Sequence, residues 1–366
     1  MSAPALRQSK RSDGFLPLAA IALSIFCSPT HLAAQTAPAL EPGPKPRDIP
    51  ARWKPWIGEY GWPPPSVPIY AVDVVSEKDG YIVWLRRYSG SAGIRYEVAD
   101  RFPVRGSFPS VHGLHIGHSG ERELVGGDLV TEKSTPDFDA RAQVLIKPLR
   151  PVAELRKEAL AATPPHEDGD FHNPELVELT TLDPAIHLDI RYATTNDFLG
   201  TPVYTQARAF MQRPAAEALV RALHKLEPLG YGLLIHDAYR PWYVTKIFWD
   251  ATPPEGKIFV ADPKEGSRHN RGCAVDLTLY DLATGKPIEM PGTYDEMSPR
   301  SFPDYPGGTS LQRWHRDLLR RAMESEGFAV YEHEWWHFDY KDWRQYPILN
   351  IKFEDLHSGQ GLAGAN

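Results

Sequence analysis

A short aromatic stretch near the end of the chain, YEHEWWHFDY (331–340), combines imidazole and carboxylate side chains at a spacing that could bind a metal. His333, Glu334 and His337 form the pattern H-E-x-x-H. On a helix this pattern places two zinc-binding imidazoles one turn apart and makes the glutamate a general base. The surrounding aromatic residues favour a β-strand instead. We therefore predict that His337 is a metal ligand, that Glu334 is the base and that His333 lies outside the metal site.

A second segment, SRHNRGCAVDLTLYD (267–281), can supply the other ligands. His269 precedes an alternating apolar stretch typical of a strand, and Asp276 lies inside that stretch between apolar neighbours. A carboxylate buried in this way needs a partner, and zinc would be one. With His337, these residues make the three-ligand set of a catalytic zinc, whose fourth position stays open for water. Taken alone, the segment also allows a structurally paired aspartate.

The strand interpretation carries a geometric requirement. Residues three apart in a regular strand face opposite sides, so Glu334 and His337 converge only if the chain bends or bulges at Trp335–Trp336. These tryptophans are expected either to wall the substrate pocket or to belong to the core, and for at least one of them the core is the favoured position.

A third segment, HDAYRPW (236–242), ends an apolar strand pattern. Pro241 prevents an uninterrupted helix, which places Arg240 at a strand end or in a loop, where functional residues concentrate. A guanidinium beside a zinc site could stabilise the oxyanion formed when water attacks a carbonyl. A surface ion pair is the alternative. The segment 189–204 is an ordinary turn by its residues alone.

Elements able to position these side chains begin near residue 175. Strand-like and amphipathic helical segments mix there without a regular βαβ repeat, which predicts an α+β fold, mostly antiparallel sheet with flanking helices. The expected strands and helices are IHLDIRYA (186–193), RPAAEALVRALHKLEP (213–228), GYGLLIHDAY (230–239) and SLQRWHRDLLRRAMESEGF (310–328).

The first half of the chain has a different composition and predicts different elements. Basic residues followed by FLPLAAIALSIFC (15–27) predict an export signal over 1–34. We expect a Pro-rich linker (35–52) that does not pack, a small β domain of unknown role (53–152), a second linker (153–174) and a zinc-bearing domain (175–366). A metal site at His112, His115 and His118 is conceivable, but scattered histidines on a hairpin are the better interpretation.

Composition bounds the partners. The formal net charge of −7 and the absence of a basic block argue against a nucleic-acid partner. Cys27 and Cys273 are the only cysteines, so removal of the signal leaves one and excludes an internal disulfide. No later run is apolar enough for a stable membrane span. We expect an exported, periplasmic or otherwise extracytoplasmic protein.

These segments together resemble the D-alanyl-D-alanine dipeptidases (VanX-type), zinc enzymes of the D-Ala-D-Ala peptidase and hedgehog-like fold. The resemblance covers roughly residues 175–357. It is carried by RYATTNDFLG, GYGLLIHDAYRP, SRHNRGCAVDLTLYDLATG and ESEGFAVYEHEWWHF, in the order of the family. The pair Trp335-Trp336 favours the dipeptidase branch over related carboxypeptidases, which commonly have Pro-Trp there.

The resemblance implies a role for each matching residue. It implies one zinc per chain on His269, Asp276 and His337, with Glu334 as the general base and Arg240 stabilising the transition state. It also implies a dipeptide site lined by Tyr192, Ser267 and Asp295, in which Asp295 meets the free ammonium group of the substrate.

The expected function is therefore zinc-dependent hydrolysis of D-alanyl-D-alanine and related D,D-dipeptides in cell-wall peptide turnover. A zinc D,D-carboxypeptidase acting on longer peptidoglycan stem peptides is the nearest alternative. A helical H-E-x-x-H protease and a non-catalytic zinc-bearing binding module are the others.

Overall fold

The computed structural model describes residues 40–61, 73–90, 93–104, 113–116, 122–126, 129–132 and 145–356. All of them belong to one compact unit, Leu40–Asn366. The expected signal, residues 1–34, lies outside the described residues. None of the described helices is both long and apolar enough to cross a membrane.

The elements form two regions along the chain. The first region contains strands β1 to β7, and the second region, from α1 onward, contains both helices and strands. The strands are β1 Gly58–Tyr60, β2 Asp73–Lys78, β3 Tyr81–Gly90, β4 Gly93–Pro103, β5 Gly113–Ile116, β6 Arg122–Gly126, β7 Leu129–Glu132, β8 Leu176–Glu178, β9 Ile186–Leu188, β10 Phe210–Gln212, β11 Tyr231–Asp237, β12 Ala274–Asp281, β13 Phe328–Tyr331 and β14 Glu334–Tyr340. The α-helices are α1 Val152–Ala161, α2 Leu179–Leu182, α3 Arg213–Leu226, α4 Trp242–Ala251 and α5 Ser310–Glu324.

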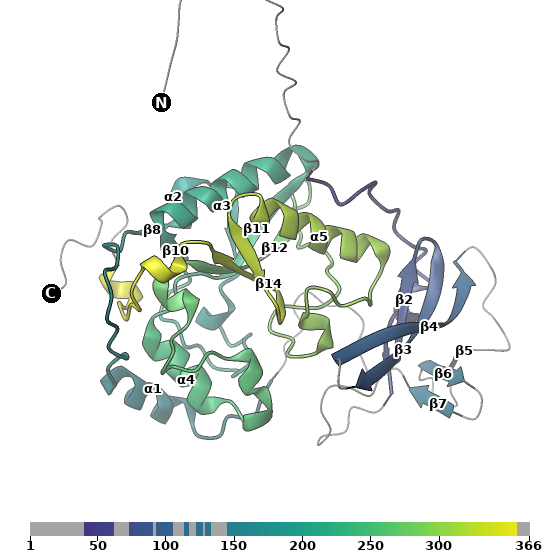
Figure 1. Ribbon diagram of the computed structural model, residues 1–366, viewed down its shortest axis with the longest axis horizontal. Helices are drawn as coiled ribbons and strands as arrows, with labels where there is room; N and C mark the ends of the chain where they lie inside the picture. Colours follow the sequence, from purple (N-terminus) through teal and green to yellow (C-terminus); the bar gives the residue numbers. More distant parts are fainter. Residues whose placement is uncertain are drawn as a thin grey trace, which may run out of the picture. The chain divides into compact units, whose positions relative to one another are not determined.

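A five-stranded sheet in the order β13-β14-β12-β11-β9 forms the centre of the second region. All neighbours are antiparallel except β11 and β9, which are parallel. The amphipathic helices α3 and α5 lie side by side against this sheet (Figure 1). Their apolar faces are buried. The prediction of an α+β fold with a mostly antiparallel sheet is confirmed.

The aromatic stretch 331–340 contains the end of one strand, a turn and the next strand, and no helix, so the alternative of a zinc-protease helix is wrong. Strand β13 ends at Tyr331, and β14 begins at Glu334 after a two-residue turn. Val330 pairs with Phe338, yet its neighbour Tyr331 pairs with Glu334. One step on β13 therefore spans four residues on β14, which is the bulge that the spacing of Glu334 and His337 requires.

A second irregularity aligns polar residues across the sheet. The pairing of β11 with β12 shifts between Ile235 and Asp237, so that Asp237 lies opposite Asp276. On its other side Asp276 lies opposite His337. The sheet thus places Asp237, Asp276 and His337 in one lateral row.

The preceding region contains two separate sheets, β1-β2-β3-β4 and β5-β6-β7. The first, called the N-terminal sheet below, has its own small core of Ile49, Trp53, Trp56, Tyr60, Val75, Ile82, Trp84 and Val104. His112 and His118 lie outside the described residues, as does the side chain of His115.

The first expected linker packs where it is described. Trp314 Nε1 donates to the carbonyl of Gly43 at 2.9 Å, and the Lys45 ammonium lies 5.7 Å from the centre of the Trp314 ring. The expectation that residues 35–52 stay unpacked is therefore wrong for this part. An extended Pro-rich segment keeps its carbonyls free, and the Trp314 indole uses one of them.

The second expected linker, 153–174, contains most of helix α1, which packs against α4. Leu155 and Ala159 on this helix are buried in the main core. Their spacing with Val152 is helical, and the Pro-rich flanks hid this short pattern. The packed part of the second region therefore begins before residue 175.

The N-terminal sheet buries an acid whose ionisation should weaken the fold. Burial raises the pKa of Glu59 to about 7, against about 4.3 in an unfolded chain. Between these two pH values the unfolded state releases the proton and the folded state keeps it, so the free energy of unfolding falls as pH rises. We expect Glu59→Gln to raise that free energy at pH 8 by on the order of 1–3 kcal/mol and to change it little at pH 4.

Urea unfolding at the two pH values measures this difference. The matched control is Glu97→Gln, an exposed glutamate of the same sheet. A gain from Glu59→Gln that is equal at both pH values would contradict the proposed cause.

Candidate metal and substrate site

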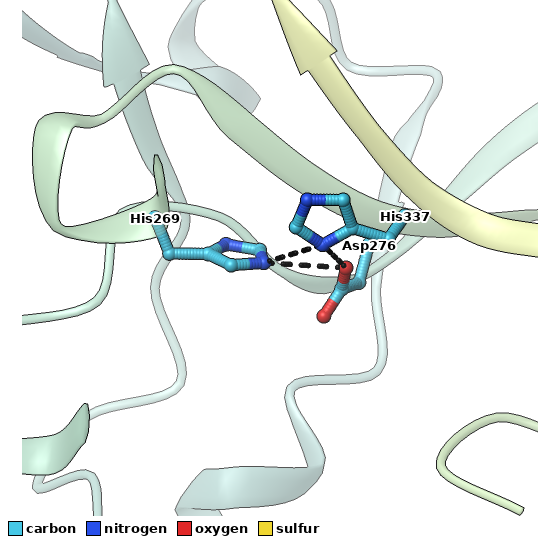
Figure 2. Close-up of side chains that lie close together, drawn as sticks. All are labelled: His269, Asp276 and His337. Carbon is cyan, nitrogen blue, oxygen red and sulfur yellow. Dashed lines mark hydrogen bonds and ion pairs between the residues drawn. The ribbon is translucent and has the colours of Figure 1, made fainter. Parts of the chain in front are cut away.

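Two members of the lateral row, Asp276 and His337, meet a third side chain, His269, which comes from a separate segment. Figure 2 shows His269 and His337 pointing toward each other and toward Asp276. His269 Nε2 lies 3.0 Å from His337 Nδ1 and 3.3 Å from Asp276 Oδ1. His337 Nδ1 lies 3.0 Å from Asp276 Oδ1. The predicted ligand set is thus brought together, and all three residues are buried.

The geometry and chemistry of this cluster fit a zinc ion. Ligand atoms about 2.0–2.1 Å from a tetrahedral zinc are about 3.3 Å from one another, and the three separations here are close to that value. Two imidazoles and a carboxylate are an ordinary donor set for zinc. Burial opposes ionisation of Asp276, but His269 and His337 outweigh it and keep the Asp276 pKa well below its usual range.

The opposite nitrogen of each imidazole is also occupied. His269 Nδ1 donates to the carbonyl of Ala238 at 2.6 Å, and His337 Nε2 donates to Asp339 Oδ1 at 2.9 Å. Such bonds fix the tautomer and the ring orientation, so that the remaining nitrogen presents a lone pair to the metal. The inner face of the cluster is therefore prepared for a cation.

His269 is aimed by a short 3-10 helix, η5 Arg268–Arg271. Ser267 caps it: its hydroxyl accepts the backbone N–H of His269 at 3.2 Å, and Asn270 Oδ1 accepts the N–H of Ser267 at 2.7 Å. Asn270 also donates to the carbonyl of Arg240 at 2.8 Å. Ser267, predicted to contact the substrate, lines a cavity in front of the cluster. It also fixes the turn that carries His269.

Arg240 lies in the loop three residues after the end of β11 and is 8% exposed. Its Nε and Nη2 atoms lie 2.9 and 2.7 Å from Asp237 Oδ2, and its Nη2 lies 3.9 Å from Asp276 Oδ2. Burial opposes the charge, but Asp237 outweighs it and keeps the Arg240 pKa above its usual range. The Tyr204 hydroxyl donates to Asp237 Oδ1 at 2.6 Å. The guanidinium is therefore a fixed positive charge beside the cluster.

Glu334 lies at the start of β14, where the bulge turns it toward the cluster. Its Oε2 atom is 3.7 Å from His337 Nδ1, and it lines the same cavity. Burial raises the pKa of Glu334 above its usual range, with His337 opposing this shift. His333 instead lies in the turn, with Nδ1 3.1 Å from the Tyr331 hydroxyl, and does not belong to the cluster.

The cavity in front of the cluster has a volume of about 460 Å³. At one side the Tyr192 hydroxyl donates to Asp295 Oδ2 at 2.8 Å. Burial and the nearby Asp276 raise the pKa of Asp295 to about 7. Trp335 and Trp336 are not among the described residues that line the cavity; both are buried in the core, at 3% and 1% exposure.

Comparison with known proteins identifies the family of the region that carries this site. The family model for D-Ala-D-Ala dipeptidases, Peptidase M15, matches residues 172–355. This is half of the chain. The chain belongs to this family.

Curated members of the family share about a third of their residues with the chain. The D-alanyl-D-alanine dipeptidase of Escherichia coli K12 is 35% identical over 179 residues, which is 91% of that protein and 49% of this chain. The enzymes of the same name from Enterococcus faecalis V583 and Streptomyces coelicolor are 36% and 37% identical over 92% and 87% of their lengths. The relatives thus align with less than half of this chain.

Two supporting residues escaped the sequence analysis. Asp237 stands three residues before Arg240 and clamps its guanidinium, and Asp339 stands two residues after His337 on the same strand face. The alternation of β14 could have suggested Asp339, because residues two apart in a strand share a face. Asp237 gave no such signal, since the bulge in β11 sets its position.

The bond between Asp339 and His337 should be measurable through metal affinity. Asp339→Ala leaves the His337 ring without its acceptor, and we expect zinc affinity to fall about 10- to 100-fold. Competition with a chromophoric chelator on the folded protein gives the dissociation constant. His333→Ala is the matched control, with unchanged affinity; a loss in this variant equal to that of Asp339→Ala would contradict the site described here.

Proposed function

We propose that the protein is a zinc dipeptidase that hydrolyses D-alanyl-D-alanine and related D,D-dipeptides to free D-amino acids. The observation that carries this proposal is the convergence of three zinc-type ligand atoms with Glu334 at one wall of a cavity. Membership of the dipeptidase family supports the substrate class.

His269, Asp276 and His337 would hold the ion, one per chain. A zinc ion supplies Lewis-acid polarisation of the scissile carbonyl and acidifies water. Glu334 takes the proton of the attacking water and delivers it to the leaving amine. Its burial favours this exchange, because a carboxylate with a raised pKa accepts a proton readily and can return it near neutral pH.

Arg240 stabilises the negative charge that develops on the carbonyl oxygen. Its guanidinium lines the cavity and is fixed by Asp237, so it needs no reorganisation when the charge appears. The same clamp keeps the cation from pairing fully with Asp276, whose Oδ2 is 3.9 Å from Arg240 Nη2.

Asp295 and Tyr192 bind the free ammonium group of the dipeptide, and Ser267 lines the rest of the site. The Asp295 residue is half-buried, and a substrate ammonium would compensate for the loss of solvent that raises its pKa. Recognition of a free amino end beside the catalytic cluster selects substrates of two residues, because a longer stem peptide has no ammonium group at that distance.

We further propose that the enzyme is exported and acts on dipeptides released from the cell wall, in turnover or recovery. The basic residues and apolar run within 1–34 support export. Outside the cytoplasm the available D,D-dipeptides derive from the wall and not from the precursor pool.

An activity assay tests the catalytic proposal. We expect zinc-loaded protein to hydrolyse D-Ala-D-Ala and Glu334→Gln to lower kcat/KM by about 10²–10⁴-fold, with zinc content unchanged. Release of D-alanine, followed by a coupled assay, measures the rate, and metal analysis measures the zinc.

The His333→Ala variant is the control and should retain activity. A pentapeptide stem substrate separates the nearest alternative: cleavage of the pentapeptide without cleavage of the dipeptide would identify a D,D-carboxypeptidase. Zinc binding without turnover of either substrate would identify a non-catalytic zinc module.

Cell fractionation tests the export proposal. We expect the protein in the extracytoplasmic fraction of its native host, with an N-terminus beyond residue 34 by mass spectrometry. Recovery from the cytosol with residues 1–34 intact would overturn this proposal and leave the catalytic one untouched.

A further inference from the structure

The residues between β12 and α5 include a segment, 291–308, that carries Asp295 and is called the binding loop below. Asp295 and Met297 have φ angles of +56° and +49°. Side chains other than glycine avoid this left-handed region, so such residues persist there only where surrounding contacts hold the backbone. The position of the Asp295 carboxylate therefore depends on what supports the loop.

Inside the loop the support comes from Glu296. Its carboxylate accepts the backbone N–H of Thr293 at 2.8 Å and the hydroxyl of Ser298 at 2.9 Å. Arg300 Nε lies 3.0 Å from the same carboxylate. These contacts tie the residues around Asp295 to one another, but they do not connect the loop to the rest of the molecule.

Tyr192 holds the Asp295 carboxylate and Tyr294 bonds Asp276, and a further anchor lies at the base of the loop. Gly308 has a φ of +76°, and a Cβ at this position would lie 3.4 Å from Pro291, so the two ends of the loop touch. Strand β2 of the N-terminal sheet meets this base. Glu77 donates its backbone N–H to the Gly308 carbonyl at 3.0 Å, and the Ser76 hydroxyl lies 2.9 Å from the Pro306 carbonyl oxygen.

The same strand also fixes the start of α5, directly after the loop. Glu77 Oε2 accepts the backbone N–H of Ser310 at 2.7 Å, one of the groups that have no partner within the helix. Arg313 on α5 donates from Nη1 to the Gly308 carbonyl at 3.0 Å and from Nη2 to the Glu77 carbonyl. Glu77 is 3% exposed, so these bonds are shielded from water.

This support is additional to the family domain. The family match begins at residue 172, and the three relatives compared above align over 87–92% of their lengths while covering less than half of this chain. Strand β2, at Asp73–Lys78, lies outside the matched residues. The binding loop is part of the matched region, whereas the strand that anchors it is not.

We propose that strand β2 is a positioning element for substrate binding: through Glu77 and Ser76 it fixes the base of the binding loop and thereby the position of Asp295. This inference rests on the proposed function, in which Asp295 binds the ammonium group of a D,D-dipeptide. In that role Asp295 makes its contact both before and during the reaction and takes no part in breaking the bond. Loss of the anchor should therefore weaken binding and leave the chemical step nearly unchanged.

The test is the steady-state kinetics of Glu77→Ala in the full-length, zinc-loaded protein; this change keeps the backbone bond to Gly308 and removes the carboxylate that accepts the N–H of Ser310 at the end of the loop. We expect KM for D-Ala-D-Ala to rise about three- to tenfold, with kcat within about twofold. Asp73→Ala is the matched control, because it also removes a carboxylate from β2. The Asp73 carboxylate accepts from Trp84 Nε1 and Arg87 N, both within the N-terminal sheet, so this variant should leave KM unchanged.

A double-mutant cycle separates positioning from a general loss of stability. In an Asp295→Ala background, the further change Glu77→Ala should alter KM by less than about twofold, because the group it positions is gone. An equal effect of Glu77→Ala in both backgrounds would overturn the proposal, as would an unchanged KM in a folded Glu77→Ala single variant. If Glu77→Ala does not fold, Ser76→Ala serves in its place, with a KM rise of about two- to threefold expected and an unchanged KM overturning the proposal.

Hydrogen exchange keeps this inference distinct from the catalytic one. Peptides spanning 291–301 should exchange faster in Glu77→Ala than in wild type, and at the wild-type rate in Asp73→Ala. If the wild-type protein fails to cleave D-Ala-D-Ala, the catalytic proposal falls and this comparison alone decides whether β2 anchors the loop. Equal exchange in all three proteins would show that it does not.

Discussion

A carboxylate removed from water, Asp276, is the constraint on which the site depends. Its ionised form is costly in a protein interior unless positive charge or hydrogen-bond donors surround it. The structure supplies them on both oxygens: His269 and His337 face Oδ1, while the Tyr294 hydroxyl donates to Oδ2 at 3.1 Å. Arg240 approaches Oδ2 more loosely. His269, His337 and Arg240 approach this carboxylate directly, and Glu334 is one contact further away, through His337.

The pairing of strands in the central sheet sets the positions of these residues. Asp237, Asp276 and His337 come from three strands far apart in sequence, and strand pairing places them side by side. Regular strands alone would not produce this row together with Glu334, since alternation sends neighbouring side chains to opposite faces. The two pairing irregularities, in β11 and in β14, interrupt this alternation, so that the side chains near them can face the same site.

Local pattern was enough to predict the fold class, the main helices and strands, and the residues that meet at the cluster. The aromatic content of 331–340 decided between strand and helix, and the need of a buried Asp276 for a partner pointed to a metal. Helix α1 escaped because its short apolar spacing lies between Pro-rich stretches. Asp237 and the docking of β2 on Gly308 escaped for another reason: both depend on which distant strands pair and in what register, which no single segment specifies.

The bulge in β14 has a consequence for recognising such sites. Because three residues of the strand fall outside the pairing with β13, the count of residues between Glu334 and His337 is fixed by sheet geometry. The helix-forming tendency of those residues is irrelevant to it. A glutamate and a histidine separated by two residues can thus occur on an α-helix or on a bulged β-strand. The types of the two intervening residues distinguish these cases. Bulky aromatic residues that pack into a core indicate the strand. A motif defined only by the spacing of its residues does not distinguish the strand from the helix.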